Sequence, residues 1–187
     1  CVSSIGPSMV RKCMLRWGAE LGDNVEVFTL SEVENVEGYV GNFEVTVRVN
    51  PRYVNPEACI ACGLCEEVCP VEVLNEWDEG LSKRKAVYLP SPQAIPYSYV
   101  VDRESCKGCG ECAKVCPTGA INLEEKPRRV KLRVGAIVLA TGFEEYKPYD
   151  LERYGYGRVK DVVTQLQLAR MLDQSGPTGG RLVRPSG

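Results

Sequence analysis

Apolar and polar residues alternate along two separate stretches of the chain, at positions 43–49 and 130–134. In both stretches, valine, leucine or phenylalanine is interleaved with a charged residue or threonine. A period of two residues is typical of an antiparallel strand with one buried face. We therefore predict two such strands, the first closed by Pro51 and the second starting after Pro127.

Three other segments have their own apolar patterns. Positions 8–21 carry an apolar stripe at helical spacing, and Gly22 follows as a stop signal. The short apolar run at 25–30 predicts a strand. The run GAIVLATG at 135–142 predicts a buried strand that ends in a tight turn at its Thr-Gly pair.

A last helix is predicted near the C-terminal end of the chain. Thr164 is a candidate N-cap, and Gln167 three residues further on completes the pattern of a capping box. Apolar residues at helical spacing continue as far as Leu172. The pair Gly176-Pro177 predicts the end of this helix.

A duplication of cysteines is the most informative pattern. Positions 59–70 and 106–117 both have the spacing Cys-x2-Cys-x2-Cys-x3-Cys-Pro, and the second run follows the first by 47 positions. This is the ligand run of ferredoxins that hold two [4Fe–4S] clusters. Five further residues recur at the same interval: Val54, Glu57, Gly63, Val68 and Pro70 return as Val101, Glu104, Gly110, Val115 and Pro117.

The spacing also predicts how the thiols divide between two clusters. Spacers of two residues allow three consecutive thiolates to fold around one face of a cubane, whereas the fourth does not easily join them. In two-cluster ferredoxins the fourth thiol, at the start of a short helical turn, ligates the other cluster. We therefore assign one cluster to Cys59, Cys62, Cys65 and Cys116, and the other to Cys106, Cys109, Cys112 and Cys69.

Glycines and prolines at set positions fit this loop geometry. Glycines suit tight turns in which the backbone approaches the sulfurs and φ is often positive. They are Gly63, Gly108 and Gly110. The prolines after Cys69 and Cys116 stop the chain from continuing the loop.

Zinc and disulfides are the alternatives to iron–sulfur clusters. Structural zinc usually takes pairs of cysteines separated by a dozen or more residues, not four thiols in one run. A disulfide framework is disfavoured because 187 residues, 44% of them hydrophobic, suffice for a core, and no secretory signal is seen. Rieske-type clusters need histidine ligands, and the chain has no histidine.

Charge and length exclude several classes of function. A formal net charge of −2 gives no case for nucleic-acid binding. The longest apolar run, at 136–140, is too short for a membrane span, so we expect a soluble, cytoplasmic protein. Without histidine, hydrolysis by a Ser-His-Asp or Cys-His arrangement is disfavoured. The first residue, Cys1, and the loop-like last segment suggest that both ends belong to something longer.

Strand patterns on both sides of the cysteine repeat predict an insertion. We expect a host domain at 1–50 and 128–187, interrupted by a two-cluster ferredoxin module at 51–127. The predicted fold class is α+β. Within the module, the interval between positions 71 and 101 is longer than a compact two-cluster ferredoxin needs.

Several strings outside the generic cysteine motif resemble one known family. The chain is similar to the iron–sulfur flavoprotein component of heterodisulfide reductase, found in methanogens and many other anaerobes. The string at 75–99 is the most specific because it lies outside the cysteine runs. The strings are SEVENVEGYVGNFEV at 31–45, NEWDEGLSKRKAVYLPSPQAIPYSY at 75–99, VGAIVLATGF at 134–143, YGYGR at 154–158 and SGPTGG at 175–180.

The resemblance implies a cofactor that the cysteines alone do not. The family is similar to thioredoxin-reductase-type flavoproteins, with a two-cluster ferredoxin inserted in an FAD-binding α/β domain. By this resemblance, Ala140, Thr141 and Gly142 lie where the host strand passes FAD. The Gly-x-Gly-x-x-Gly fingerprint for the pyrophosphate is missing from the chain, and the resemblance places FAD in the full-length parent.

The expected function follows from the clusters and the resemblance together. We expect electron transfer through two [4Fe–4S] clusters to or from FAD, in an oxidoreductase of the heterodisulfide reductase type; the segment alone serves electron transfer without a catalytic residue. The resemblance implies that the flavin bifurcates electron pairs. It also implies partners: other subunits of that type, a hydrogenase or formate dehydrogenase subunit for electron input, and ferredoxin. The alternatives are a flavin-free ferredoxin-like carrier or docking module, and a flavoprotein of quinone-linked sulfur metabolism.

Charge is distributed unevenly over the two repeats. Positions 57–79 contain seven acidic residues and no lysine or arginine, whereas positions 102–116 balance three acids against three bases. Because an electron is harder to add near negative charge, we predict the lower potential for the cluster wrapped by the first run. The alternative is a solvated acidic surface whose field is screened by salt.

A basic stretch flanks the second predicted strand. Its members are Lys126, Arg128, Arg129, Lys131 and Arg133. Such residues usually form the solvated face of an edge strand. The alternative is that they pair with flavin phosphates or with an acidic redox partner.

Overall fold

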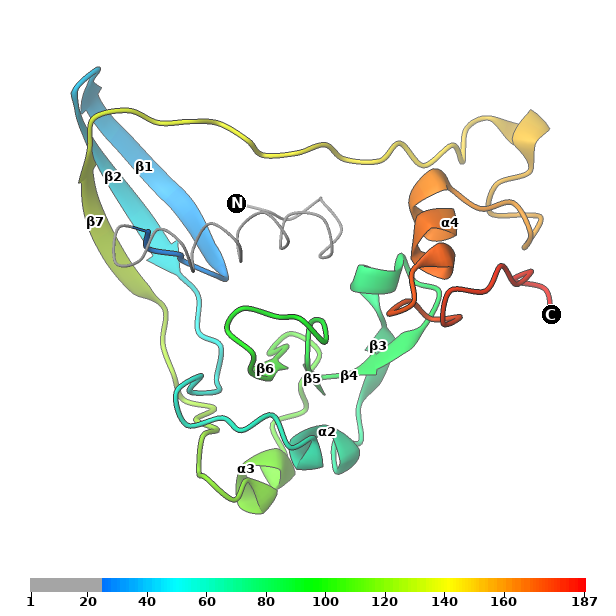
Figure 1. Cartoon of the computed structure of the whole chain (residues 1–187), viewed down its shortest axis with the longest axis horizontal. Coiled ribbons are helices and arrows are strands. Elements are labelled where there is room, and N and C mark those ends of the chain that lie inside the picture. The colour runs from blue at the N-terminus through cyan, green and yellow to red at the C-terminus, as the bar shows by residue number, and fades with distance from the viewer. Residues whose placement is uncertain (1–24) are drawn as a thin grey trace.

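A sheet, a cysteine-bearing module and a C-terminal segment make up the part of the protein that the computed structural model describes, residues 25–187 (Figure 1). The module lies in the chain between two strands of the sheet, and the C-terminal segment follows the last of them. The helix predicted at 8–21, with Cys13 on its apolar stripe, lies outside the described residues.

The sheet contains three antiparallel strands in the order β1-β2-β7. They are β1 (Ser31–Tyr39), β2 (Asn42–Val49) and β7 (Arg128–Val134). β2 and β7 pair without a register shift, from Phe43 opposite Val134 to Val49 opposite Arg128. The strands predicted from the alternation at 43–49 and 130–134 are thus confirmed.

The strand predicted at 25–30 is wrong, because the first strand begins at Ser31, directly after the predicted segment. The hairpin places Ser31 opposite Val49, the last residue of β2, so the preceding residues have no partner strand there. Leu30 also adopts a positive φ of 54°, which interrupts an extended chain.

The hairpin of β1 and β2 depends on Gly38, where a Cβ atom would lie only 2.2 Å from the carbonyl oxygen of Asn42.

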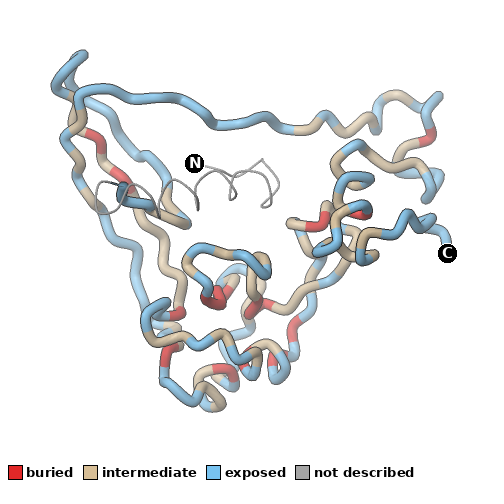
Figure 2. Tube along the Cα trace, in the orientation of Figure 1, coloured by how far each residue is buried: buried red, intermediate tan, exposed pale blue. Residues whose placement is uncertain are grey.

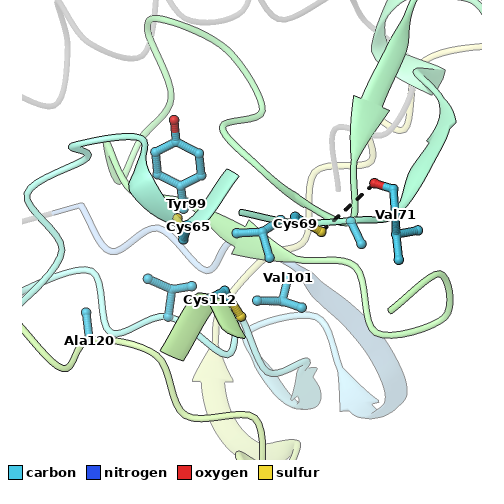
Figure 3. Close-up of a cluster of buried hydrophobic side chains, with 10 residues drawn as sticks. Cys65, Cys69, Val71, Tyr99, Val101, Cys112 and Ala120 are labelled. Atoms are coloured by element: carbon cyan, nitrogen blue, oxygen red, sulfur yellow. Dashed lines mark hydrogen bonds between the residues drawn. The ribbon is translucent and has the colours of Figure 1, made fainter. Parts of the chain in front are cut away.

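The cysteine-bearing module packs around two short helices and short strands. The helices are α2 (Leu64–Glu67) and α3 (Glu111–Val115), and β5 (Val87–Tyr88) pairs with β6 (Val100–Val101). A bridge between Val54 and Ile121 joins the two ends of the module. Its core contains residues of both repeats, including Cys65, Cys69 and Cys112 (Figure 3). Much of the burial in Figure 2 falls in this module.

Part of the long interval between the two cysteine runs forms a hairpin that contacts the C-terminal helix. β3 (Glu72–Leu74) pairs with β4 (Lys83–Lys85), and the 3-10 helix η2 (Glu76–Asp78) lies in the connection. Its buried Asp78 accepts hydrogen bonds from Nε (3.1 Å) and Nη2 (2.8 Å) of Arg170. This pair attaches the C-terminal helix to the module.

The C-terminal helix α4 (Gln165–Leu172) begins as predicted. The Thr164 hydroxyl accepts from the Gln167 N–H at 3.3 Å, and the Gln167 side chain accepts from the Thr164 N–H at 3.0 Å, which completes the capping box. The helix ends at Leu172, before the predicted stop at Gly176-Pro177. A further 3-10 helix, η3 (Glu152–Tyr154), precedes it.

The buried strand predicted at 135–142 is wrong for this chain. The segment after β7 forms no strand and is exposed, and it crosses toward the C-terminal part as a long connection (Figures 1 and 2). Val138 and Leu139 are 89% and 84% exposed. An apolar run becomes a buried strand only when neighbouring strands flank it, and no strand in residues 25–187 pairs with this one.

Candidate metal centre

Four cysteines from both repeats line one cavity of the module. The cavity has about 320 Å³ of space, part of it open to solvent. Three of its thiols belong to the first run, and the fourth, Cys116, comes from the second. The four are Cys59, Cys62, Cys65 and Cys116, the group that the spacing assigns to one cluster.

Local backbone geometry brings the first three thiols to this cavity. Gly63 takes a left-handed conformation (φ 88°) and starts α2, which carries the buried Cys65 inward. Ala61 also has a positive φ of 52°. Upstream, the Cys59 N–H donates to the Asn55 carbonyl at 3.0 Å, which closes the entrance of the loop. The tight turn predicted at Gly63 is therefore present.

The second set of thiols gathers in the same way around Cys112. Gly110 (φ 75°) starts α3 just as Gly63 starts α2, and Gly108 has a φ of 72°. The electrostatic neighbours of Cys112 are the three other members of its predicted set: Cys106, Cys109 and Cys69. Both sets thus cross from one repeat to the other.

We predicted the fourth thiol of each run at the start of a short helical turn. This prediction is wrong, because each of these thiols follows a helical turn. α2 ends at Glu67, two residues before Cys69, and α3 ends at Val115, directly before Cys116. The helical turn is therefore the element that separates the third thiol from the fourth. It turns the chain away from the first three thiols, and the proline that follows each fourth cysteine prevents the helix from continuing.

Burial and hydrogen bonding set the acidity of these thiols. Burial, followed by the nearby thiols of Cys59 and Cys62, raises the pKa of Cys65 to about 12. Burial also raises the pKa of Cys112. Burial opposes ionisation of Cys116 too, yet hydrogen bonds from Thr118 and Ala120 lower its pKa. A bound metal must offset the cost of ionising the buried thiols, because only thiolates are ligands.

The four cysteines of the first set line a cavity and do not converge on the position of a single metal ion. In residues 25–187, no group of three or more cysteine, aspartate or glutamate side chains could hold a single metal ion. A tetrahedral zinc ion with bonds of about 2.3 Å would bring its sulfurs within about 3.8 Å of one another. Four thiols around a cavity fit a larger group, and the all-sulfur donor set fits an iron–sulfur cluster.

Tyr99 is a cavity residue that sequence reasoning missed. It is buried, lines the first cavity and lies beside Cys65 (Figure 3). Its hydroxyl donates to Glu66 Oε2 at 3.0 Å, and burial followed by this carboxylate raises the pKa of Tyr99. Tyr99 occupies the position equivalent to Arg52 in the first repeat, so the repeat offered no signal for it.

The structure alters the charge contrast predicted for the two repeats. Four of the seven acids at 57–79 form ion pairs: Glu72 with Lys85 (2.9 Å), Glu76 with Arg84 (2.6 Å), Asp78 with Arg170 (2.8 Å) and Glu79 with Lys147 (2.7 Å). Within the described residues, Glu57, Glu66 and Glu67 have no ion-pair partner, and they remain as the basis for a lower potential. The basic stretch behaves similarly, because Arg129 and Lys131 pair with glutamates of β1 and β2.

The residues predicted to lie near FAD begin 24 positions after the last cysteine of the second run. Ala140, Thr141 and Gly142 lie on the exposed connection between β7 and η3 (Figure 2). They do not line the cavity of the first cysteine set.

Among residues 25–187, no helix is long and apolar enough to cross a membrane.

Comparison with known families agrees with the geometry of the cysteines. Residues 58–120 match the model of the 4Fe-4S dicluster domain. This range contains all eight cysteines of the two sets and both short helices. The chain is thus a protein with a dicluster iron–sulfur domain, and its two cysteine motifs serve two [4Fe–4S] clusters.

The similarity to known proteins extends beyond this domain. The chain is 54% identical over 165 residues to an iron-sulfur subunit of the CoB–CoM heterodisulfide reductase of Methanopyrus kandleri. It is 49% identical over 163 residues to the corresponding subunit of the H(2)/formate:CoB-CoM heterodisulfide,ferredoxin reductase of Methanococcus maripaludis. It is 45% identical over 164 residues to the corresponding subunit of the H(2):CoB-CoM heterodisulfide,ferredoxin reductase of Methanothermobacter marburgensis.

These matches cover 87% to 88% of this chain and 25% of each relative. The chain is therefore a homologue of this iron–sulfur subunit of heterodisulfide reductase, and it spans about a quarter of the length of the curated relatives it matches.

Proposed function

We propose that this chain is the electron-transfer segment of a heterodisulfide-reductase-type flavoprotein. Cys59, Cys62, Cys65 and Cys116 bind one [4Fe–4S] cluster, and Cys106, Cys109, Cys112 and Cys69 bind the other. The observation that carries this assignment is the exchange of the fourth thiol between the repeats: Cys116 lines the first cavity, and Cys69 is a neighbour of Cys112.

The chemistry of the site is single-electron transfer. When bound, each cluster takes up and releases one electron. The chain supplies the rest of the site: Cys65 and Cys112 are buried, and the shared core of the two repeats holds both sets of thiols within one small module. Two clusters in one module provide a short relay between an electron donor and an acceptor.

We further propose that the sheet and the C-terminal segment belong to an FAD-binding domain that the module interrupts. The exposed apolar residues Val138 and Leu139 favour a surface that other parts of the parent cover. In this arrangement Ala140, Thr141 and Gly142 lie next to FAD.

The partners proposed for the parent follow from the names of its relatives. Those names contain hydrogen, formate, ferredoxin and the CoB–CoM heterodisulfide. We propose that electrons enter from the subunit of a hydrogenase or formate dehydrogenase, and that they leave toward ferredoxin and the heterodisulfide through other components of the complex. The FAD of the parent would divide electron pairs between these two acceptors.

The ligand assignment is tested on the full-length protein after anaerobic reconstitution. Iron, acid-labile sulfide and EPR spectra are measured for the wild type and for single Cys→Ser variants. We expect Cys116→Ser to alter the same EPR signal as Cys59→Ser, and Cys69→Ser to alter the same signal as Cys106→Ser. Cys13→Ser, outside both runs, is the matched control and keeps both signals. Zinc in place of iron, or a single cluster, would contradict the proposal.

A flavin-free electron carrier is the second candidate. The observation in its favour is that the module has a core of its own, and that all members of this core within residues 25–187 lie at 53–123. Such a core is what an independent ferredoxin needs. The flavin content of the full-length protein distinguishes the candidates: FAD in stoichiometric amount supports the flavoprotein, and its absence from a protein with two intact clusters supports the carrier.

A further inference from the structure

The two cysteines that cross between the repeats have different neighbours. Cys116, in the first cavity, lies 3.6 Å from the hydroxyl oxygen of Thr118. The N–H of Ala120 donates to the same sulfur at 3.3 Å. Cys69, its equivalent in the first repeat, instead contacts the carbonyl oxygen of Val71 at 3.9 Å (Figure 3). The two sulfurs therefore differ in the polarity of the groups that face them.

Ligation makes this difference sharper. A cysteine that binds iron is a thiolate, so its sulfur has no proton to donate. In the contact between Cys116 and Thr118, only the Thr118 hydroxyl is then left as a donor. In the contact between Cys69 and Val71, no donor is left, because a backbone carbonyl only accepts.

The backbone explains why only one of the two cysteines acquires such donors. After Cys116 the chain makes a tight turn in which Gly119 adopts a φ of 62° and its N–H donates to the Cys116 carbonyl at 3.2 Å. This turn brings the Thr118 hydroxyl and the Ala120 N–H to one sulfur. The residue equivalent to Gly119 in the first repeat is Glu72, which starts strand β3 opposite Lys85. An extended strand cannot fold back on Cys69 in this way.

Thr118 is also dispensable for packing. Its side chain is exposed and lies outside the core of the module, whereas its equivalent Val71 is a buried member of that core. Removing the Thr118 hydroxyl should therefore leave the fold intact and change only what the sulfur of Cys116 contacts.

We propose that the Thr118 hydroxyl donates a hydrogen bond to the Cys116 thiolate and raises the reduction potential of the cluster in the first cavity. This inference rests on the proposed ligand assignment. Reduction adds negative charge to a cluster and its sulfurs, so a donor to sulfur stabilises the reduced form more than the oxidised form. Thr118 therefore counteracts Glu57, Glu66 and Glu67, which have no ion-pair partner within residues 25–187 and act on the same loop in the opposite direction.

The test is a redox titration followed by EPR, on the reconstituted full-length protein. Thr118→Val removes the hydroxyl at nearly constant shape, and Thr118→Ser retains it. We expect Thr118→Val to lower one midpoint potential so that the ratio of reduced to oxidised cluster at a fixed potential falls by up to about tenfold, or ~59 mV for one electron. Thr118→Ser keeps the wild-type value. Cys116→Ser and Cys69→Ser identify which midpoint belongs to which cavity.

Three results of the titration would overturn the inference. They are unchanged midpoints in Thr118→Val, the same shift in Thr118→Ser, and a shift of the midpoint that Cys69→Ser perturbs. Loss of iron from Thr118→Val alone would also overturn it, because the hydroxyl would then be structural. Failure of the proposed function is distinguished from failure of this inference by the wild type. If the proposed function fails, the reconstituted wild-type protein itself lacks the iron and acid-labile sulfide of two clusters.

Discussion

The loops of the first and second cysteine runs follow the same turns in different surroundings. Gly63 and Gly110 start equivalent helical turns, and Asn55 and Asp102 close the two loop entrances in the same way. The paths separate after the fourth cysteine. The first run continues into a hairpin that holds helix α4, and the second into the tight turn at Thr118. The comparison shows that duplicated spacing preserves the ligand geometry, while the segments that follow each run determine what surrounds the sulfurs.

The largest effect is expected where the first run's hairpin holds helix α4. Arg170→Met leaves the buried Asp78 carboxylate without its cation, and breaking a buried pair in this way costs about 3 kcal/mol. We expect faster amide exchange at 165–172, measured by mass spectrometry, with both clusters retained. Arg181→Met, an exposed arginine of the same segment, is the control and should change nothing. Unchanged exchange in Arg170→Met would show that the pair does not hold the helix.

A smaller effect is expected at the entrance of the second loop. The Asp102 carboxylate accepts from Ser105 Oγ at 2.8 Å and from Arg84 Nη2 at 2.9 Å. Burial opposes ionisation, but these hydrogen bonds lower the pKa of Asp102. A lowered pKa in the folded state stabilises the protein above the unfolded pKa of about 3.9, and this contribution is lost as the pH falls through the folded value.

Replacement of Asp102 tests this contribution. Asp102→Asn should lower the free energy of unfolding in urea by about 1–2 kcal/mol at pH 7 and by less at a pH of about 3, below the unfolded pKa. Its equivalent Asn55 already closes the first loop without a charge, since its side chain accepts from the Glu57 N–H at 3.0 Å. The converse variant Asn55→Asp is the matched control, and no comparable gain is expected. An equal loss at both pH values for Asp102→Asn would exclude the carboxylate charge as the cause.

The smallest effect concerns two equivalent residues with positive φ. Gly108→Ala should cost about 1–2 kcal/mol, because its φ is 72° and a Cβ atom would lie 3.4 Å from the Arg103 guanidinium. Ala61→Gly should stabilise the protein by up to about 1 kcal/mol, because relief of its strained φ is only partly offset by the greater freedom of glycine in the unfolded chain. Urea unfolding of both variants provides the measurement. A loss of stability in Ala61→Gly would show that the two turns are not equivalent.

The sequence predicted well wherever the signal was local. The spacing of the thiols, the period of two at 43–49 and the capping box at Thr164 each involve residues close together in the chain. Such patterns directly constrain backbone conformation, and the corresponding elements are present. The spacing also predicted the crossing of Cys69 and Cys116, because three thiols at two-residue intervals leave the fourth out of reach of its own loop.

The failures occurred where a partner distant in the chain decides the outcome. The apolar run at 135–142 has the composition of a buried strand, yet burial requires neighbouring strands that residues 25–187 do not provide. The acids at 57–79 appeared as one negative field until folding paired four of them with bases from the hairpin and the C-terminal segment. Pairing depends on distances across the fold, which composition does not contain.

By itself, the sequence predicted the two sets of thiols, because ligand spacing and turn chemistry are properties of neighbouring residues. Only the tertiary structure decided which charges form ion pairs near each set and that helix α4 attaches to the hairpin through Asp78. It also decided that one crossing sulfur faces the Thr118 hydroxyl and the other the Val71 carbonyl. The physical reason is that electrostatic and hydrogen-bond energies depend on separation in space, and folding brings together groups that the chain keeps apart.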